Sequence, residues 1–230
     1  MKKQKAEQYS TAIIGTGYLA YRDLTSLIQT YVTGYNALDY GCGRGRSSQF
    51  LASLNFKVEA VDCCSHMVST ISDKNPMIDY RHIKPFEGDF KGQHFDLVLS
   101  QLVLVEIDSL IKLRAMLKEQ FEALKPGGIL IQSTTSDAFL HHSWLSIDTT
   151  HPKNKKVSNG EAGKITLINR KLELDSYHWD ESFLMKEFKR AGFNPLTVHQ
   201  PLGEKSDPYH WVSETTVSPY RIFVLAKTNS

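Results

Sequence analysis

The sequence predicts an α/β fold in which a mostly parallel sheet is covered by helices on both faces. Short apolar runs alternate with amphipathic stretches over residues 18–133, the order produced by repeated strand–helix–strand units. A glycine-rich turn follows the first of these runs. The length of 230 residues and the hydrophobic content of 41% suit one domain with a sizeable core. We therefore expect a single domain over residues 1–230.

Each expected element has its own signal. Apolar residues at helical spacing predict the helices, Asn75–Pro76 ends one of them, and Lys125–Pro126–Gly127–Gly128 ends another. Continuous apolar runs predict buried strands, of which FDLVLS is the strongest. The predicted helices are 18–32, 47–54, 65–72 and 109–124, and the predicted strands are 36–40, 57–61, 78–83, 95–100 and 129–133.

The alternation breaks after the strand at 129–133. Residues 136–176 are polar, contain the basic run Lys153–Lys156 and include a possible hairpin, ITLINRKLEL. A helix from 180 to 191 and strands at 196–199 and 220–226 follow. We expect residues 136–176 to form an inserted lid over the active edge of the sheet, and a helical cover to occupy residues 1–34.

Composition limits the classes of partner. The formal net charge is only +2, which makes a nucleic-acid partner unlikely on electrostatic grounds. No apolar stretch approaches the roughly 20 residues of a membrane span, so we expect a cytoplasmic protein without membrane contacts. The three cysteines do not form a disulfide or zinc pattern, and no H-x-x-x-H pair is present, so we expect no metal. Both a monomer and a homodimer remain open.

The chemistry of the chain is concentrated in ALDYGCGRGRSS. A strand ends at Asp39, glycines stand at 41, 43 and 45, and a helix begins. Glycine allows tight turning and close ligand approach, and the helix start presents free N–H groups. The dinucleotide pattern G-x-G-x-x-G fails, because its third glycine position is Arg46. After the next strand, Asp62 is placed to accept hydrogen bonds from two ribose hydroxyls.

These segments resemble the class I S-adenosylmethionine-dependent methyltransferases of small-molecule type. DYGCGRG, VEAVDCCSHM, FDLVLSQLVLVEI and LKPGGILIQST stand in the order and spacing of that family. The resemblance implies a seven-stranded, mostly parallel sheet whose last strand is antiparallel. The expected lid insertion at 136–176 then follows the fifth strand. The resemblance implies S-adenosylmethionine as cofactor. It also implies these contacts: Asp39, Gly41, Gly43 and Gly45 around the methionine end, Asp62 at the ribose, Cys63 and Met67 beside the adenine, and Ser100 and Gln101 near the methyl group.

Some positions are assigned on weaker signals. Many relatives carry an acid after the third strand, whereas this chain has Tyr80 to Pro85 there, so we expect Ile83 to pack on the adenine. Arg22, in the N-terminal helix, is expected to pair with the methionine carboxylate or else with a neighbouring acid. His141 and His142 follow the fifth strand and are candidate substrate contacts, and no catalytic base is assigned. Glu106 and Asp108 are interpreted as acids at a helix start.

The expected reaction is direct methyl displacement onto an oxygen, nitrogen or carbon nucleophile of a small molecule. Alignment of the reacting atoms can account for several kcal/mol of the barrier. Three alternatives remain: an RNA or protein methyltransferase, a non-catalytic S-adenosylmethionine-binding protein, and an NAD oxidoreductase. The low net charge opposes an RNA substrate, and the displaced glycine opposes NAD.

Overall fold

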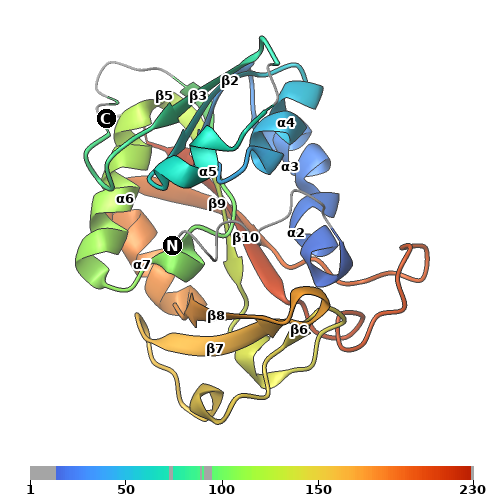
Figure 1. The fold of residues 1–230 in the computed structure, drawn as a ribbon. Coiled ribbons are helices and arrows are strands. Elements are labelled where there is room, and N and C mark those ends of the chain that lie inside the picture. The colour runs from blue at the N-terminus through green and yellow to red at the C-terminus, as the bar shows by residue number, and fades with distance from the viewer. Residues whose placement is uncertain (1–13, 73–74, 89, 91–94, 229–230) are drawn as a thin grey trace.

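A seven-stranded sheet forms the centre of the molecule (Figure 1). The computed structural model describes residues 14–72, 75–88, 90 and 95–228; the expected cover over residues 1–13 lies outside this part. The strand order is β3-β2-β1-β4-β5-β10-β9. The strands are β1 (Asn36–Tyr40), β2 (Lys57–Asp62), β3 (Ile78–His82), β4 (Phe95–Ser100), β5 (Leu124–Thr135), β9 (Phe193–His199) and β10 (Tyr220–Lys227).

Strand β10 alone runs against the others in this sheet, since it pairs antiparallel with both β5 and β9, whereas β1, β2, β3, β4 and β5 pair in parallel. The expectation of a mostly parallel sheet with an antiparallel last strand is confirmed. Every residue of β4 is buried, as is typical of a central parallel strand covered on both faces. The segment FDLVLS, which is apolar except for Asp96 and Ser100, is consistent with coverage on both faces.

Helices cover both faces of the sheet (Figure 1). On one face α6 (Leu110–Ala123) and α7 (Glu181–Arg190) pack Leu117 and Phe188 into one core cluster. On the other, α3 (Leu24–Tyr31) and α4 (Arg46–Ser53) pack Ile28 and Leu51 into a second cluster. The short α5 (Ser65–Ser69) follows β2. Within the described residues, no helix has the length and apolar character required to cross a membrane.

The first and third predicted helices differ from the structure, and the third ends at Ser69 rather than at residue 72. The region 18–32 is divided into η1 (Gly15–Tyr18), α2 (Leu19–Arg22) and α3, because Asp23 leaves the ideal helical backbone with φ −98° and ψ −1°. Helix α6 ends at Ala123, one residue before the predicted end, but β5 begins at Leu124 rather than at residue 129 and includes the helix-ending segment Lys125–Gly128. Periodicity alone does not locate these boundaries.

The inserted segment forms a second, three-stranded antiparallel sheet. Its strands are β6 (Ile147–Asp148), β7 (Ala162–Leu167) and β8 (Leu172–Tyr177). The predicted hairpin is confirmed, since Leu167 pairs with Leu172 across the turn. The turn consists of η5 (Ile168–Arg170) and Lys171. Figure 1 shows this small sheet as a separate layer below the main sheet. The insertion also contains η3 (Phe139–His141) and η4 (Pro152–Lys155).

A third core cluster joins the N-terminal segment to the insertion. Leu19 from α2 packs there with Phe139, Trp144, Ile147 and Tyr220. The rings of Phe139 and Trp144 stack with centroids 5.8 Å apart. Because Tyr220 pairs with Thr135 in the main sheet, this cluster fixes the insertion beside the carboxyl end of β5. The insertion therefore lies at the edge where open α/β sheets bind their ligands.

Candidate active site

The glycine-rich turn connects β1 to α4 in a conformation that requires glycine. Gly41, Gly43 and Gly45 have φ values of 81°, 55° and 84°, in the left-handed region that side chains disfavour. A Cβ atom on Gly41 would collide with Val103, and one on Gly45 would stand 2.6 Å from the Tyr80 hydroxyl. A Cβ on Gly43 would meet no atom within 4 Å. Gly43 therefore exposes its backbone to open space.

Asp39, at the end of β1, is hydrogen-bonded to the first turn of α4. Its side chain is fully buried, and Oδ2 accepts hydrogen bonds from Ser47 Oγ at 2.7 Å and Ser48 Oγ at 2.5 Å. Oδ1 is buried without a hydrogen-bond partner among the described residues. Burial raises the pKa of Asp39 to about 6, although the two hydroxyls oppose the shift. Asp39 thus ties α4 to β1.

The raised pKa of Asp39 predicts a pH-dependent stability. The native state binds this proton more tightly than the unfolded chain, so ionised Asp39 destabilises the fold above pH 6 and the cost disappears as the pH falls toward 4. Asp39→Asn is therefore expected to increase the free energy of unfolding relative to wild type at pH 8, by an amount that shrinks on acidification. Urea unfolding at pH 5, 6, 7 and 8 measures this, with exposed Asp79→Asn as control. An Asp39→Asn difference that is constant with pH would contradict it.

Asp62, at the end of β2, connects that strand to the turn. Its Oδ2 accepts the Gly43 N–H at 2.8 Å, and its Oδ1 accepts the Cys64 N–H at 2.7 Å. Burial raises the pKa of this carboxyl, and the two backbone donors oppose the shift. A carboxylate has about four acceptor positions, so the two backbone bonds leave capacity for further donors. Asp62 is in position to accept hydroxyl hydrogen bonds from a ligand.

A cavity of about 410 Å³, called the larger cavity below, lies above the turn. The structure brings seven of the predicted site residues into its lining, while Asp39, Gly45, Ser100 and Arg22 are outside it. All three cysteines line it; Cys42 is buried, Cys64 is partly buried and Cys63 is exposed. The seven predicted residues are Gly41, Gly43, Asp62, Cys63, Met67, Ile83 and Gln101.

Gly45 does not line the larger cavity, but it fixes the start of α4. Gly45→Ala forces a side chain into left-handed backbone and displaces the Tyr80 hydroxyl. We expect the free energy of unfolding to fall by about 1–3 kcal/mol and cofactor affinity to fall with it. Urea unfolding and calorimetry are the measurements. Gly17→Ala is the matched control, because a Cβ there meets nothing within 4 Å. Equal effects of the two variants would contradict this reading.

The carboxyl end of β4 is held by Ser133. Its hydroxyl accepts the Leu102 N–H at 2.9 Å and donates to Gln101 Oε1. Leu102 has a φ of 57°, an unfavourable backbone for leucine, of the kind that clusters at functional sites. Gln101 Nε2 and Ser100 Oγ are both buried without partners among the described residues. Gln101 therefore presents a donor at the larger cavity.

Arg22 and the two candidate histidines lie elsewhere. Arg22 donates to Asp23 at 2.7 Å and to Asp207 at 3.0 Å, which realises the alternative of pairing with a neighbouring acid. The side-chain hydrogen bonds to Asp23 raise the pKa of Arg22. Because these carboxylates bind the guanidinium, the structure does not bring Arg22 to the larger cavity. His141 and His142 line neither this cavity nor the one described next; the His142 ring instead lies 5.9 Å from that of Trp144.

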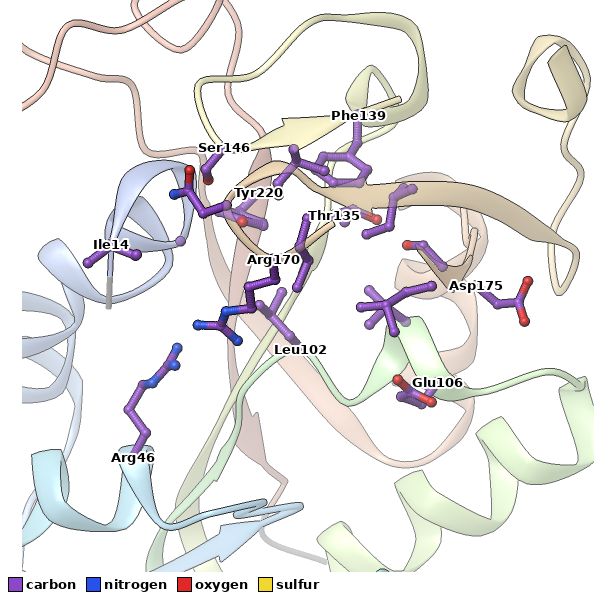
Figure 2. A pocket seen from close by; sticks show the side chains of 18 residues that line it. Ile14, Arg46, Leu102, Glu106, Thr135, Phe139, Ser146, Arg170, Asp175 and Tyr220 are labelled. Carbon is purple, nitrogen blue, oxygen red and sulfur yellow. The ribbon is translucent and has the colours of Figure 1, made fainter. Parts of the chain in front are cut away.

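A smaller cavity of about 150 Å³ opens between the insertion and the main sheet (Figure 2). Apolar side chains from several segments form much of its wall, including Leu102, Phe139, Ile165, Leu167 and Leu174. Charged side chains also line it: Arg46, Glu106, Arg170 and Asp175. Arg46, Leu102 and Glu106 line both cavities. The two cavities therefore meet at these three residues.

Sequence reasoning missed these shared residues. In the sequence, Arg46 only marks the failure of the dinucleotide motif. Glu106 was interpreted as a helix-start acid, whereas it ends η2 (Leu104–Glu106), and Ser109 caps α6 with its hydroxyl accepting the Lys112 N–H at 3.4 Å. Leucine gives no signal for the left-handed backbone of Leu102. Their position after β1 and β4, at the carboxyl edge of the sheet, is the one usable sequence signal.

The larger cavity fits the expected cofactor. Asp62, Met67 and Ile83 line it, so that carboxylate oxygens suited to ribose hydroxyls lie with apolar side chains suited to a planar ring. At the other end, Gly43 leaves open space at its backbone, and the buried Nε2 of Gln101 requires an acceptor. The donor and acceptor set thus matches a molecule with a ribose at one end and an amino-acid group at the other.

A cluster of potential metal ligands also occurs outside the cavities. One ligand atom each from Asp137, His178 and Asp180 lies within 4.8 Å of the others. Buried Arg221 donates to Asp137 at 2.6 Å, and His178 contacts Asp180 at 3.0 Å. Because the Arg221 guanidinium already contacts Asp137, we assign this cluster a structural role, in which it packs β10 against the segment before α7.

Residues 37–128 match the family model of a methyltransferase domain. A ubiquinone biosynthesis O-methyltransferase of Parvibaculum lavamentivorans is 25% identical over 175 residues, covering 74% of this chain and 67% of that protein. The same enzyme name belongs to a Ruegeria pomeroyi protein 34% identical over 106 residues, covering 44% of this chain and 41% of the relative. The match thus spans about two thirds or less of these relatives.

Solved structures show the same fold. A putative S-adenosylmethionine-dependent methyltransferase from Listeria monocytogenes superposes with a TM-score of 0.66 at 18% identity, covering 92% of this chain and 99% of the other. A Burkholderia thailandensis 1,6-didemethyltoxoflavin-N1-methyltransferase, solved with bound 1,6-didemethyltoxoflavin and S-adenosylhomocysteine, gives a TM-score of 0.59 at 15% identity, covering 92% of this chain and 79% of the other. Residues 37–128, which carry the glycine turn and Asp62, thus resemble a methyltransferase domain, and the fold is that of solved S-adenosylmethionine-dependent methyltransferases.

Proposed function

We propose that this chain methylates a small-molecule acceptor bound in the smaller cavity. The main support for this proposal is that Arg46, Leu102 and Glu106 line both cavities. A ligand in one cavity can therefore reach a ligand in the other. The relatives named as ubiquinone biosynthesis O-methyltransferases support a small-molecule acceptor.

When bound, S-adenosylmethionine supplies a methyl group carried by a cationic sulfur. After the methyl group is transferred, this sulfur is left as a neutral thioether. Asp62 binds the ribose end of the larger cavity, and Gln101 donates at the methionine end. Leu102, whose N–H is bound by Ser133, lines both cavities where they meet. Glu106 lines both and is placed to accept the proton that an acceptor hydroxyl or amine gives up on methylation, a contribution typically worth 10²–10⁴-fold.

The insertion and the N-terminal segment form the cover in this proposal. Strands β7 and β8 contribute Ile165, Leu167 and Leu174 to the smaller cavity, and η1 contributes Gly17. Their apolar surface excludes water from the acceptor, which strengthens the electrostatic interactions at the junction. Residues 1–230 then act as one domain, with the N-terminal segment and residues 136–176 as its cover.

The proposal is tested in two steps. Calorimetric titration of the purified protein with S-adenosylmethionine and S-adenosylhomocysteine is expected to give micromolar binding. A screen with labelled methyl groups then covers single-ring phenols, amines and carboxylates, with RNA and whole-protein lysate as separate arms. Methylation of a small molecule alone supports the proposal. Binding without transfer in any arm supports a non-catalytic binding protein, and transfer to RNA or protein overturns the acceptor class.

A further inference from the structure

We infer that the smaller cavity takes a neutral acceptor with a single apolar ring, and that Gly17 leaves the space which this ring occupies. The inference rests on the proposed methyltransferase function and specifies its acceptor. Gly17 lines the smaller cavity and not the larger one, so the cofactor does not account for it. A Cβ atom on Gly17 would meet no atom within 4 Å. The position is therefore open, and a side chain there would fill space beside the acceptor.

The residues directly before Gly17 tie η1 to the insertion. Gly15 has a φ of 59°, and a Cβ atom there would stand 2.6 Å from the Cβ atom of Ser146. The Thr16 N–H donates to Ser146 Oγ at 3.0 Å, and the Ser146 N–H donates to Thr16 Oγ1 at 3.2 Å. Figure 2 shows Ser146 and Ile14 on the same side of the smaller cavity. Gly17 thus belongs to a wall in which η1 and the insertion are in close contact.

A buried carboxylate holds this wall in position. Glu214 is fully buried, and its Oε1 accepts the Thr16 hydroxyl and the Leu145 N–H, both at 2.8 Å. Its Oε2 accepts the Val212 N–H at 2.9 Å. Hydrogen bonds to an ionised acceptor are stronger than those between neutral groups. Because three segments converge on Glu214, η1 has little freedom to move away from a side chain added at Gly17.

The charges that line the smaller cavity balance. Its charged lining residues among those described are two arginines and two carboxylates: Arg46, Arg170, Glu106 and Asp175. Removing an ionic ligand from water is costly unless opposite charge in the site compensates for it. A lining with equal numbers of both signs has no excess charge for that purpose. The charge distribution therefore favours a neutral acceptor over an anion or a cation.

The volume and the apolar walls limit the acceptor to one ring. Leu102 and Val105 line the smaller cavity from the segment after β4, and Phe139 and Leu174 line it from the insertion. The volume is about 150 Å³, and an apolar protein cavity of roughly that volume accommodates benzene. One ring with short substituents fits this space, whereas a fused second ring exceeds it. A leucine side chain at position 17 would compete with the ring for the same space.

The test compares acceptors of different size and charge. Protein saturated with S-adenosylhomocysteine is titrated calorimetrically with phenol, catechol and 4-methylphenol. The two-ring counterparts are 2-naphthol and 2,3-dihydroxynaphthalene, and 4-hydroxybenzoate is the anionic counterpart of 4-methylphenol. At least one single-ring compound is expected to bind about ten-fold or more tightly than its two-ring counterpart. Binding of 4-methylphenol should be tighter than binding of 4-hydroxybenzoate.

Variants then fill the cavity at one position and enlarge it at another. Gly17→Leu should weaken binding of the preferred single-ring compound by about ten-fold or more, and Gly17→Ala should weaken it less. Leu174→Ala should instead improve binding of the two-ring counterpart. The affinity for S-adenosylhomocysteine should not change in any of them. Gln29→Leu, which adds a leucine at an exposed position of α3 that lines neither cavity, should bind as wild type.

Thermal unfolding shows which variants are folded, and Gly17→Ala and Leu174→Ala keep the comparison decisive if Gly17→Leu is not. Four results overturn the inference: equal affinity for one- and two-ring compounds, no binding of any single-ring compound, tighter binding of 4-hydroxybenzoate than of 4-methylphenol, or wild-type acceptor affinity in the folded Gly17 variants. In each case, retained S-adenosylhomocysteine binding leaves the methyltransferase proposal standing. Failure of the folded wild type to bind S-adenosylhomocysteine is instead a failure of the proposed function itself.

Discussion

Replacing Asp62 by alanine is expected to weaken S-adenosylmethionine binding by at least about 100-fold. The carboxylate would accept hydrogen bonds from ribose hydroxyls, and bonds to charged groups contribute about 1.5–3 kcal/mol each. Its loss also releases the Gly43 and Cys64 N–H groups, which it accepts at 2.8 Å and 2.7 Å, and so loosens the glycine turn. Calorimetric titration with S-adenosylmethionine measures the effect directly.

A neighbouring acid provides the control for Asp62→Ala. Asp79 lies on β3, next to β2, is exposed and lines neither cavity, so Asp79→Ala should bind the cofactor as wild type. Thermal unfolding without cofactor shows whether Asp62→Ala remains folded. A folded variant with wild-type affinity would remove Asp62 from the cofactor site. Asp62→Asn keeps one acceptor oxygen, so its affinity for S-adenosylmethionine should lie between that of Asp62→Ala and that of wild type.

Glu106→Gln is expected to lower kcat by about 100-fold or more with an acceptor that loses a proton. Glutamine keeps the size of the side chain but cannot take up the proton at neutral pH. Affinity for S-adenosylmethionine should change little, since Glu106 contributes one of many lining side chains to the larger cavity. Steady-state kinetics from pH 6 to 9, with the acceptor identified by the screen, separates the loss in kcat from any change in KM.

Asp108→Asn is the control for Glu106→Gln. Asp108 is two residues away, lines neither cavity and pairs with Lys112 at 2.6 Å. Its replacement should leave kcat within a factor of three. If Glu106→Gln falls in the same range, the proton leaves by another route, and Glu106 does not act as the base.

The parts of the site that follow from backbone geometry were predictable from the sequence. Parallel strands bring their carboxyl ends to one edge, so Asp62 and Gln101 could be placed at the same site from the ends of two apolar runs. The three glycines were recognisable because no other residue adopts their backbone at low cost. The segment ITLINRKLEL likewise predicted the hairpin formed by β7 and β8.

The rest depended on contacts between distant segments. Arg22 lies in the predicted helical region, but the acids that bind it, Asp23 and Asp207, include one 185 residues away. Nothing local reveals that pairing. Arg170 is one charged residue in a polar hairpin, and only the packing of the insertion against the main sheet brings it beside Arg46. Asp39 has the predicted place in the chain, but it lies beneath the turn because Ser47 and Ser48 hold it there.

The second sheet has an evolutionary consequence. Its strands supply Ile165, Leu167, Leu174 and Asp175 to the smaller cavity and nothing to the larger one. Mutations in β7, β8 and their turn can therefore change which acceptor is recognised while the inherited cofactor cradle stays intact. Proteins with this fold can therefore acquire new acceptors through substitutions in one short hairpin. Exchange of β7–β8 between homologues is a practical route to altered acceptor selectivity.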